Sequence, residues 1–340
     1  MRRTLVFLML TVAAVYLVVL AGSLEPPGPP GPTMKPLDQC CPRSPILASD
    51  LPLTIIAPGS YYLAENIRIP DAGIIIAADD VTLDLGGFAM VRTTFGSVIE
   101  ADGVEGLTIR NGILRTTETG AVVQVANVRG FVLEDVRIVT TYGQGLNMTS
   151  ASGFRIRDNE FHGGAVISVV YMSGSGGVVS DNFFSTTGAG GLALSGNDTI
   201  VENNRFLPDC SGAPSSCSAI ETSADGCRIS GNTVSKSGTL SVEFDFGFSV
   251  YGDDNVISDN VIKGCGTGIF VGGVRNVIGH NLLNNNLGFG LRLFSSATDN
   301  VYHGIVARGN GGGTCSGPGA TGFCDEGTGN TSAGDNYMPF

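Results

Sequence analysis

The sequence predicts an all-β protein that folds as a parallel β-helix of about ten coils, and three observations lead to this fold class. An asparagine motif recurs at intervals of 21 to 28 residues. Each unit contains short apolar segments that alternate with polar residues, which is typical of β-strands. No unit contains the ten or more residues of helical periodicity that a helix would need. Short strands that repeat in this way stack as coils through backbone hydrogen bonds.

The repeat is defined by six hexapeptides that align in one frame. They are "IRDNEF" (156–161), "VSDNFF" (179–184), "VENNRF" (201–206), "ISGNTV" (229–234), "ISDNVI" (257–262) and "IGHNLL" (278–283). The residues that they share are Asn159, Asn182, Asn204, Asn232, Asn260 and Asn281. Weaker copies extend the frame backward to "LDLGGF" (83–88) and forward to "VYHGIV" (301–306), so the coils cover roughly residues 73–310.

We interpret the shared asparagines as structural. A tight corner between two strands needs a residue that tolerates left-handed backbone angles, and asparagine does so best after glycine. Gly87, Gly112 and Gly304 stand at the same position in weaker copies, which favours this explanation. Stacked coils also align the side-chain amides, so we predict a hydrogen-bonded ladder rather than a ligand site.

The chain divides into four regions by composition. Residues 1–23 carry two arginines and then an apolar run, the pattern of a secretory signal peptide, with an uncleaved membrane anchor as the alternative. Residues 24–44 form a Pro/Gly-rich linker. Residues 45–310 form the parallel β-helix, capped at its N-terminus by an opening strand. Residues 311–340 leave the repeat and form an irregular, disulfide-containing C-terminal cap over the exposed edge of the last coil.

Charge and cysteine content limit the partners and the compartment. The net charge of −12 argues against a nucleic-acid partner, because neutralising phosphates requires a basic surface. Eight cysteines indicate an oxidising compartment, so we expect a secreted, periplasmic or cell-surface protein. Cys210 with Cys217, and Cys315 with Cys324, are plausible local disulfides. The other four cysteines cannot be paired from the sequence; they are Cys40, Cys41, Cys227 and Cys265. The spacings do not suggest zinc.

A candidate binding surface follows from the repeat. Residues eleven positions before each asparagine should point outward from one sheet. With a slip of one residue at the less regular coils, this column comprises Asn147, Tyr171, Ala193, Glu221, Ser249, Phe270 and Arg292. Aromatic rings mixed with hydrogen-bonding groups favour sugar recognition, and an ordinary solvated sheet face is the alternative.

Two insertions direct attention to the neighbourhood of Glu221. "LPDCSGAPSSC" (207–217) and "SKSGTLSVEFDFG" (235–247) both precede the strand that carries the column. The second brings Glu243 and Asp245, which we expect to lie beside Glu221. Three carboxylates could supply an acid and a base for glycoside cleavage, or could hold a calcium ion. The alternative is that these are solvated charges.

The sequence resembles exported bacterial right-handed parallel β-helix proteins of the pectin-lyase-like superfamily, including the periplasmic copper-maturation type. The resemblance is carried by "LTIIAPGSYYLAENI" (53–67), "DDVTLDLGGFAM" (79–90) and the "SDN" corners (180–182 and 258–260). It implies polysaccharide chemistry along a groove over one parallel sheet. No catalytic set transfers, although "YGDDN" (251–255) begins like an epimerase motif, and we add Tyr251 to the candidate substrate-binding residues.

Two functions therefore remain as hypotheses. In the first, an exported β-helix binds an extended polysaccharide along one sheet, with lyase or hydrolase activity left open. In the second, the protein is a non-catalytic structural or surface scaffold. No cofactor is predicted apart from the calcium alternative, and the membrane is a partner only if the N-terminal segment stays uncleaved. The glycan and the oligomeric state are not predicted.

Overall fold

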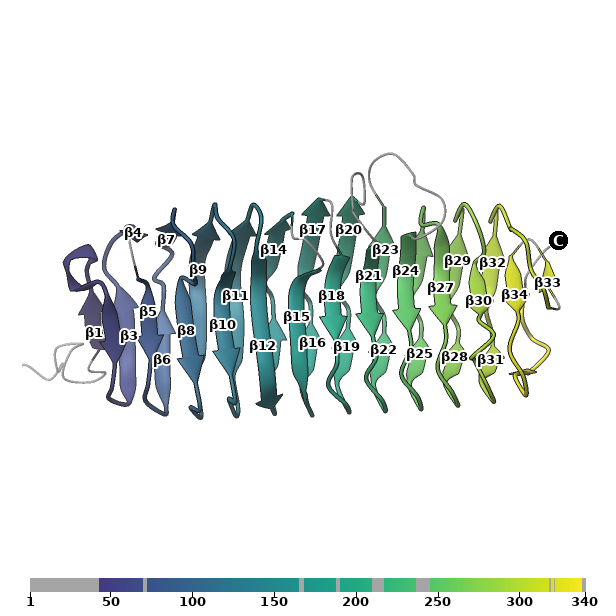
Figure 1. Cartoon of the computed structure of the whole chain (residues 1–340), viewed down its shortest axis with the longest axis horizontal. Helices are drawn as coiled ribbons and strands as arrows, with labels where there is room; N and C mark the ends of the chain where they lie inside the picture. The colour runs from purple at the N-terminus through teal and green to yellow at the C-terminus, as the bar shows by residue number, and fades with distance from the viewer. Residues whose placement is uncertain are drawn as a thin grey trace, which may run out of the picture. The chain divides into compact units, whose positions relative to one another are not determined.

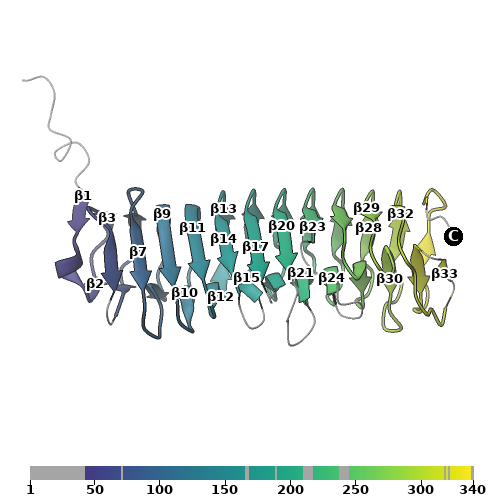
Figure 2. The same cartoon turned by 90° about the horizontal axis from the view of Figure 1, so that it is seen from above.

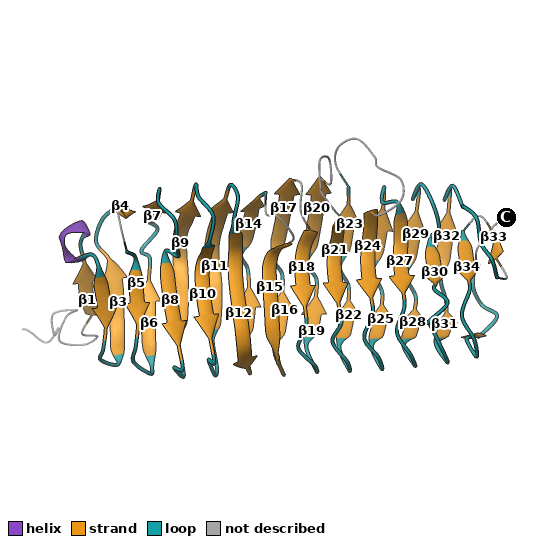
Figure 3. Cartoon of the chain, in the orientation of Figure 1, coloured by secondary structure: helices purple, strands orange, loops and turns teal. Residues whose placement is uncertain are grey.

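The computed structural model describes residues 43–69, 72–164, 168–187, 190–209, 217–236, 245–317, 319–320 and 322–337. Throughout these residues the regular structure is β-strand, apart from one short 3-10 helix, η1 (Ala48–Asp50), drawn in purple in Figure 3. Over the same ranges no helix is long and apolar enough to cross a membrane. The predicted signal peptide or anchor and most of the linker lie outside the described residues.

One sheet has 13 strands, and we call it the groove sheet. Its strands are β2 (Leu53–Ile55), β5 (Ile74–Ile76), β8 (Ile99–Asp102), β10 (Ala121–Ala126), β12 (Gln144–Ser152), β15 (Ser168–Ser175), β18 (Gly190–Leu194), β21 (Cys217–Thr222), β24 (Asp245–Val250), β27 (Thr267–Val271), β30 (Leu291–Leu293), β34 (Phe323–Asp325) and β33 (Gly319–Ala320). All neighbours pair in parallel except β33 and β34, which are antiparallel.

The other sheet has 22 strands that form two parallel ladders joined through two long strands, β9 (Thr108–Thr116) and β11 (Val132–Thr140). The first ladder contains β1 (Arg43–Ile46), β3 (Gly59–Leu63), β6 (Val81–Asp84), β13 (Arg155–Arg157), β16 (Val178–Ser180), β19 (Ile200–Glu202), β22 (Arg228–Ser230), β25 (Val256–Ser258), β28 (Val277–Gly279), β31 (Val301–His303) and β35 (Thr331–Ser332). The second contains β4 (Ile67–Ile69), β7 (Ala89–Arg92), β14 (Glu160–Gly163), β17 (Phe183–Thr187), β20 (Arg205–Asp209), β23 (Thr233–Ser235), β26 (Val261–Lys263), β29 (Leu282–Asn284) and β32 (Val306–Arg308).

Each regular coil contributes one strand to the groove sheet and one to each ladder, as β15, β16 and β17 do in succession. Successive coils then stack in parallel, as Figures 1 and 2 show. The predicted all-β parallel β-helix of about ten coils is confirmed. Because every coil pairs only with its neighbours, residues one coil apart in sequence form continuous columns on each face.

The interior is one continuous apolar cluster made from the inward-facing residues of every coil. Phe161, Phe184 and Phe206 occupy equivalent positions in three consecutive coils. Their rings stack with centroid separations of 5.0 and 4.5 Å, and the side chains are at most 1% exposed. Such a stack buries large apolar area and fixes the register of three coils at once.

The predicted asparagine ladder is present. From Asn182 onward, the side-chain oxygen Oδ1 of each rung accepts hydrogen bonds from the backbone N–H and the side-chain Nδ2 of the asparagine one coil earlier, and Asn159 Oδ1 accepts from the backbone N–H of Val136. For Asn204 these two bonds run to Asn232 Oδ1 at 2.9 and 3.0 Å. The same pattern joins Asn159, Asn182, Asn204, Asn232, Asn260 and Asn281. All six side chains are at most 2% exposed, so their polar atoms are satisfied inside the protein.

The prediction that the shared asparagines themselves adopt left-handed backbone angles is wrong by one residue. Left-handed φ angles belong to the residue before each rung: Asp158, Asp181, Asn203, Gly231, Asp259 and His280 (φ 53° to 68°). The rung itself must turn its amide inward, and the preceding residue makes the corner. Gly304 (φ 58°) also occupies the corner, because β28 pairs Ile278 with Tyr302 and shifts the predicted frame by one.

Two further ladders run beside the first and were not predicted. One joins Asn255, Asn276, Asn300 and Asn330, and the other joins Asn286 to Asn310. They occupy other corners of the same C-terminal coils.

The ends of the β-helix differ in one respect from the prediction. The C-terminal segment was expected to leave the repeat, yet β34 and β35 continue the parallel pairing onto β30 and β31. The predicted Cys315–Cys324 disulfide is present in this segment. Cys217 is also disulfide-bonded, but its predicted partner Cys210 lies outside the described residues. Cys227 and Cys265 are free and buried.

Candidate functional site

The outward column predicted on the groove sheet has the predicted register. Asn147, Tyr171, Ala193, Glu221, Ser249, Phe270 and Arg292 are each paired with the next in consecutive parallel strands. The column continues toward the N-terminus through Gln124, Glu100, Ile75 and Thr54. The slips of one residue at Asn147 and Arg292 are therefore correct.

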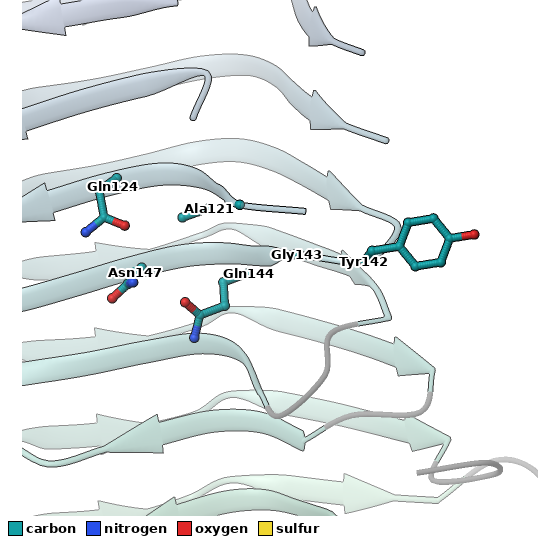
Figure 4. Close-up of a pocket in the computed structure, with 7 residues that line it drawn as sticks. Ala121, Gln124, Tyr142, Gly143, Gln144 and Asn147 are labelled. Atoms are coloured by element: carbon teal, nitrogen blue, oxygen red, sulfur yellow. The ribbon is translucent and has the colours of Figure 1, made fainter. Parts of the chain in front are cut away.

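Two hollows lie along this column. The first, of about 370 Å³, is lined by Gly120, Ala121, Gln124, Tyr142, Gly143, Gln144 and Asn147 (Figure 4). The second, of about 210 Å³, is lined by Gln144, Ser168, Tyr171, Ala193, Leu194, Ser195, Glu221 and Ser223. Gln144 borders both, so the two hollows adjoin. From Asn147 to Glu221 the column crosses three coil steps, or ~14 Å at the usual strand spacing.

The C-terminal part of the column differs from the prediction, because Ser249 and Phe270 are buried (1% and 8% exposed). The Phe270 ring lies 5.2 to 5.7 Å from the rings of Phe246, Tyr251 and Phe294. Ser249 Oγ lies 2.9 Å from Ser218 Oγ. Tyr251 and Phe294 remain exposed, at 48% and 39%. The accessible aromatic surface here therefore belongs to these two rings, of which Tyr251 was predicted.

Arg292 is engaged with its neighbours. Its guanidinium donates to both carboxylate oxygens of Glu326 (3.2 and 3.0 Å) and lies over the rings of Phe289 and Phe294. Burial alone would raise the pKa of Glu326, but hydrogen bonds from Arg292 and Ser316 outweigh it and hold that pKa below its ordinary value. The carboxylate thus stays charged and neutralises the positive charge of Arg292.

Glu221 is the predicted catalytic carboxylate that the structure places on the groove. It is half-buried and borders the second hollow. Burial raises the pKa of Tyr251, and the negative charge of Glu221 raises it further. The phenol of Tyr251 therefore stays protonated near neutral pH and can donate a hydrogen bond.

The predicted trio of carboxylates is not assembled as expected. Asp245 pairs with Cys217, whereas Glu221 pairs with Ser249, so Asp245 lies four residues along the strand from the level of Glu221, ~13 Å away. Asp245 is 3% exposed and forms a buried ion pair with Lys236. Glu243 lies outside the described residues. The acid–base and calcium predictions thus lose Asp245, whose charge Lys236 already compensates.

Three residues of the first hollow were missed: Gln124, Gln144 and Tyr142. Gln124 lies in a coil that lacks the shared asparagine, because β11 places Val136 at the rung position. Tyr142 and Gln144 belong to the coil of Asn159, but they precede Asn147 and so lie outside the eleven-residue count. Counting one coil back from Asn147 along the same column would have found Gln124.

The structure is similar to the A-modules of two mannuronan C-5 epimerases from Azotobacter vinelandii, AlgE4 and AlgE6. For AlgE4 the TM-score is 0.62 at 14% identity, covering 83% of this chain and 91% of that one. For AlgE6 the values are 0.60, 14%, 82% and 91%. These are right-handed parallel β-helix proteins, which confirms the predicted fold resemblance. No curated protein sequence matches the chain significantly.

The family described as "Periplasmic copper-binding protein (NosD)" matches residues 104–287. Copper prefers imidazole, thiolate and thioether ligands. Within the described ranges, the group of three possible ligand residues that lie close together is Cys315, Cys324 and Glu326, and its two sulfurs are joined in the disulfide. The rings of His280 and His303 meet edge to face with centroids 4.8 Å apart, and in the part of the chain that the structure describes no His, Cys, Asp or Glu adds a third ligand atom to this pair. This donor set does not fit copper, so no step is derived through it.

The family's compartment agrees with the cysteine chemistry. The matching family is periplasmic, and the Cys315–Cys324 disulfide requires an oxidising environment. The predicted export is therefore confirmed. Since the match covers more than half of the sequence, the chain belongs to the NosD family of periplasmic proteins.

Proposed function

We propose that the groove sheet binds an extended polysaccharide along its outward column. The observation that carries the proposal is the pair of adjoining hollows, which share Gln144 and follow one column of side chains across several coils. A ligand that contacts both must be long and must run across the strands. A polysaccharide has this form, and the epimerases that share the fold are named for a polymer, mannuronan.

The side chains along the hollows suit sugars. Tyr171 lines the second hollow, and Tyr251 and Phe294 expose aromatic rings further along the sheet. Such rings pack against the C–H faces of sugars, while amides, hydroxyls and carboxylates bind the hydroxyl groups. Glu221 accepts hydrogen bonds in this setting, and its half-buried position strengthens them relative to water.

Binding is proposed without a reaction. Cleavage by two carboxylates needs a second group at a defined distance from the first, and Asp245 is withdrawn into its pair with Lys236. Lyase or hydrolase activity therefore stays a separate prediction, which rests on Glu221 alone among the described candidates.

The proposal is tested by affinity electrophoresis of the exported chain through gels that contain single polysaccharides. Tyr171→Ala and Glu221→Gln are compared with Phe183→Ala and Glu202→Gln, which alter half-buried residues of the same type on the 22-stranded sheet. We expect retardation by at least one polysaccharide, lost in the first pair and kept in the second. Equal behaviour of both pairs, or no retardation by any polymer, would overturn the proposal.

The same polysaccharide is then incubated with the protein and assayed for reducing ends and unsaturated products. Product that disappears in Glu221→Gln would add catalysis to binding. If no polysaccharide binds at all, the rod-like scaffold hypothesis is favoured instead.

A further inference from the structure

The first hollow has a lining of uncharged amides. Gln124, Gln144 and Asn147 are half-buried and project from two neighbouring strands, and Figure 4 shows their amides on the same face. The ring of Tyr142, 60% exposed, extends from the adjoining corner. Gly120 and Gly143 also line the hollow, and both positions need glycine, because Gly120 has φ 124° and a Cβ on Gly143 would overlap the Gly120 carbonyl.

One side-chain atom of a residue that lines this hollow lacks a partner among the described residues. Asn147 Oδ1 is buried and accepts no hydrogen bond from any described residue. Leaving a buried amide oxygen without a donor costs about 1–3 kcal/mol. Most side-chain polar atoms in this structure are satisfied, as in the asparagine ladders. This oxygen belongs to a residue that lines a hollow, which makes it a candidate acceptor for a donor from a ligand.

The charges along the column oppose an acidic ligand. At its outward positions from Thr54 to Arg292 the charged residues are Glu100, Glu221 and Arg292. Arg292 is neutralised by Glu326, whereas Glu100 neighbours Gln124 directly across the sheet. A polyuronate would bring one carboxylate per sugar beside these acidic groups, without an unpaired cation in the column to receive it.

We propose that this hollow is a binding subsite for uncharged sugar units, in which Asn147 Oδ1 accepts a sugar hydroxyl and Gln124 and Gln144 bind its neighbours. Tyr142 covers an apolar face of the sugar at the rim. The inference rests on the proposed function and adds the class of ligand. It places the groove among binders of neutral polymers, although the epimerases with the same fold are named for an acidic one.

The test uses Tyr142→Trp as a reporter, since the chain contains no tryptophan. Neutral glucan oligosaccharides and alginate oligosaccharides are titrated separately while tryptophan emission is followed. We expect the emission to change with a neutral oligosaccharide, and the alginate affinity to be at least tenfold lower. Tighter binding of alginate, or groove binding that leaves the emission unchanged, would overturn the inference.

A matched pair of variants isolates the amide. Asn147→Ala removes the unpartnered oxygen from the hollow, and Asn284→Ala removes an equivalent buried, unpartnered Oδ1 on β29 of the other sheet. We expect Asn147→Ala to weaken neutral-sugar binding about tenfold and Asn284→Ala to leave it unchanged. Equal effects would contradict the subsite. Gln144→Ala serves as the second groove variant if Asn147→Ala fails to fold.

The outcomes separate the two proposals. If no polysaccharide binds, the proposed function fails. A different outcome is binding that depends on Tyr171 and Glu221, is unaffected by substitution of Asn147 or Gln144, and leaves the Tyr142→Trp emission unchanged. In that case only the subsite proposal is contradicted.

Discussion

The side-chain amide of Asn204 donates a hydrogen bond to Oδ1 of Asn232, 3.0 Å away in the next coil. The residue before it, Asn203, has the same side chain and a different role, because it takes the left-handed backbone conformation at φ 56°. Asn204 donates further to the carbonyls of Val179 and Glu202. One of two adjacent asparagines therefore holds coils together, and the other turns the chain.

This division predicts opposite responses to substitution. Asn204→Ala would leave buried backbone and side-chain groups of its neighbours without partners, and should lower the free energy of unfolding by about 3 kcal/mol. Asn203→Gly should change it by less than about 1 kcal/mol, since glycine readily adopts a positive φ. Urea unfolding followed by circular dichroism measures both. Comparable losses would contradict the assignment.

The N-terminal coils should weaken in acid through Asp84. Burial alone would raise the pKa of this carboxyl, but hydrogen bonds from Gly86, Asn111 and Arg43 outweigh it and lower the pKa below 3.8. A lowered folded-state pKa gives stability that is present above pH 3.8 and is lost as pH falls through the folded value.

Asp84→Asn should therefore destabilise the protein by about 1–3 kcal/mol at pH 7 and less at pH 3. The urea midpoint, measured from pH 7 to pH 2.5, tests this. If the difference in urea midpoint between the variant and the wild type stays constant over this pH range, the charge of the Asp84 carboxylate is not the source of the stability. Asp50→Asn, in the exposed η1 segment, is the control.

The free thiols of Cys227 and Cys265 should be inert in the folded protein. Burial raises the pKa of Cys265 to about 12 and also raises that of Cys227. Their contribution to stability is full below about pH 9 and is lost for Cys265 as pH rises toward 12. Alkylation at pH 8 should label neither residue until urea unfolds the chain, as mass spectrometry of tryptic peptides would show. If the folded protein is labelled as fast as an exposed thiol, the two cysteines are not buried.

The C-terminal disulfide should stabilise the last coil. Cys315 and Cys324 are separated by nine residues, and closing a loop of this size stabilises by about 2–3 kcal/mol. The double variant Cys315→Ser/Cys324→Ser should unfold at lower urea, beginning at the C-terminal coils, and proteolysis should cut first after residue 310. An unchanged midpoint and cleavage pattern would contradict the capping role.

The repeat made the fold and the outward column predictable. The spacing of apolar residues shows the strand alternation, and the spacing of the shared asparagines shows the coil length. Tyr171 and Glu221 were found by counting eleven residues back from the shared asparagines. The count works because parallel stacking keeps the same register from coil to coil. The corner was misplaced by one residue because glycine and asparagine satisfy both a left-handed φ and a small side chain, and sequence alone does not separate the two demands.

The site was less predictable where contacts cross between coils. Phe270 faces outward as predicted, yet the rings of Phe246, Tyr251 and Phe294 cover it. Asp245 was expected in the groove, but a buried cation, Lys236, draws it away. Both depend on side chains whose neighbours come from different coils, and periodicity carries no information about which side chains pair there.

The central claim is that the groove sheet binds a polysaccharide, and calorimetric titration with the oligosaccharide chosen by electrophoresis tests it most directly. The account predicts saturable binding by the wild-type chain, weakened at least tenfold in Tyr171→Ala/Glu221→Gln and unchanged in Phe183→Ala/Glu202→Gln. Equal weakening in both double variants, or heat signals absent from the wild type with every oligosaccharide, would contradict it.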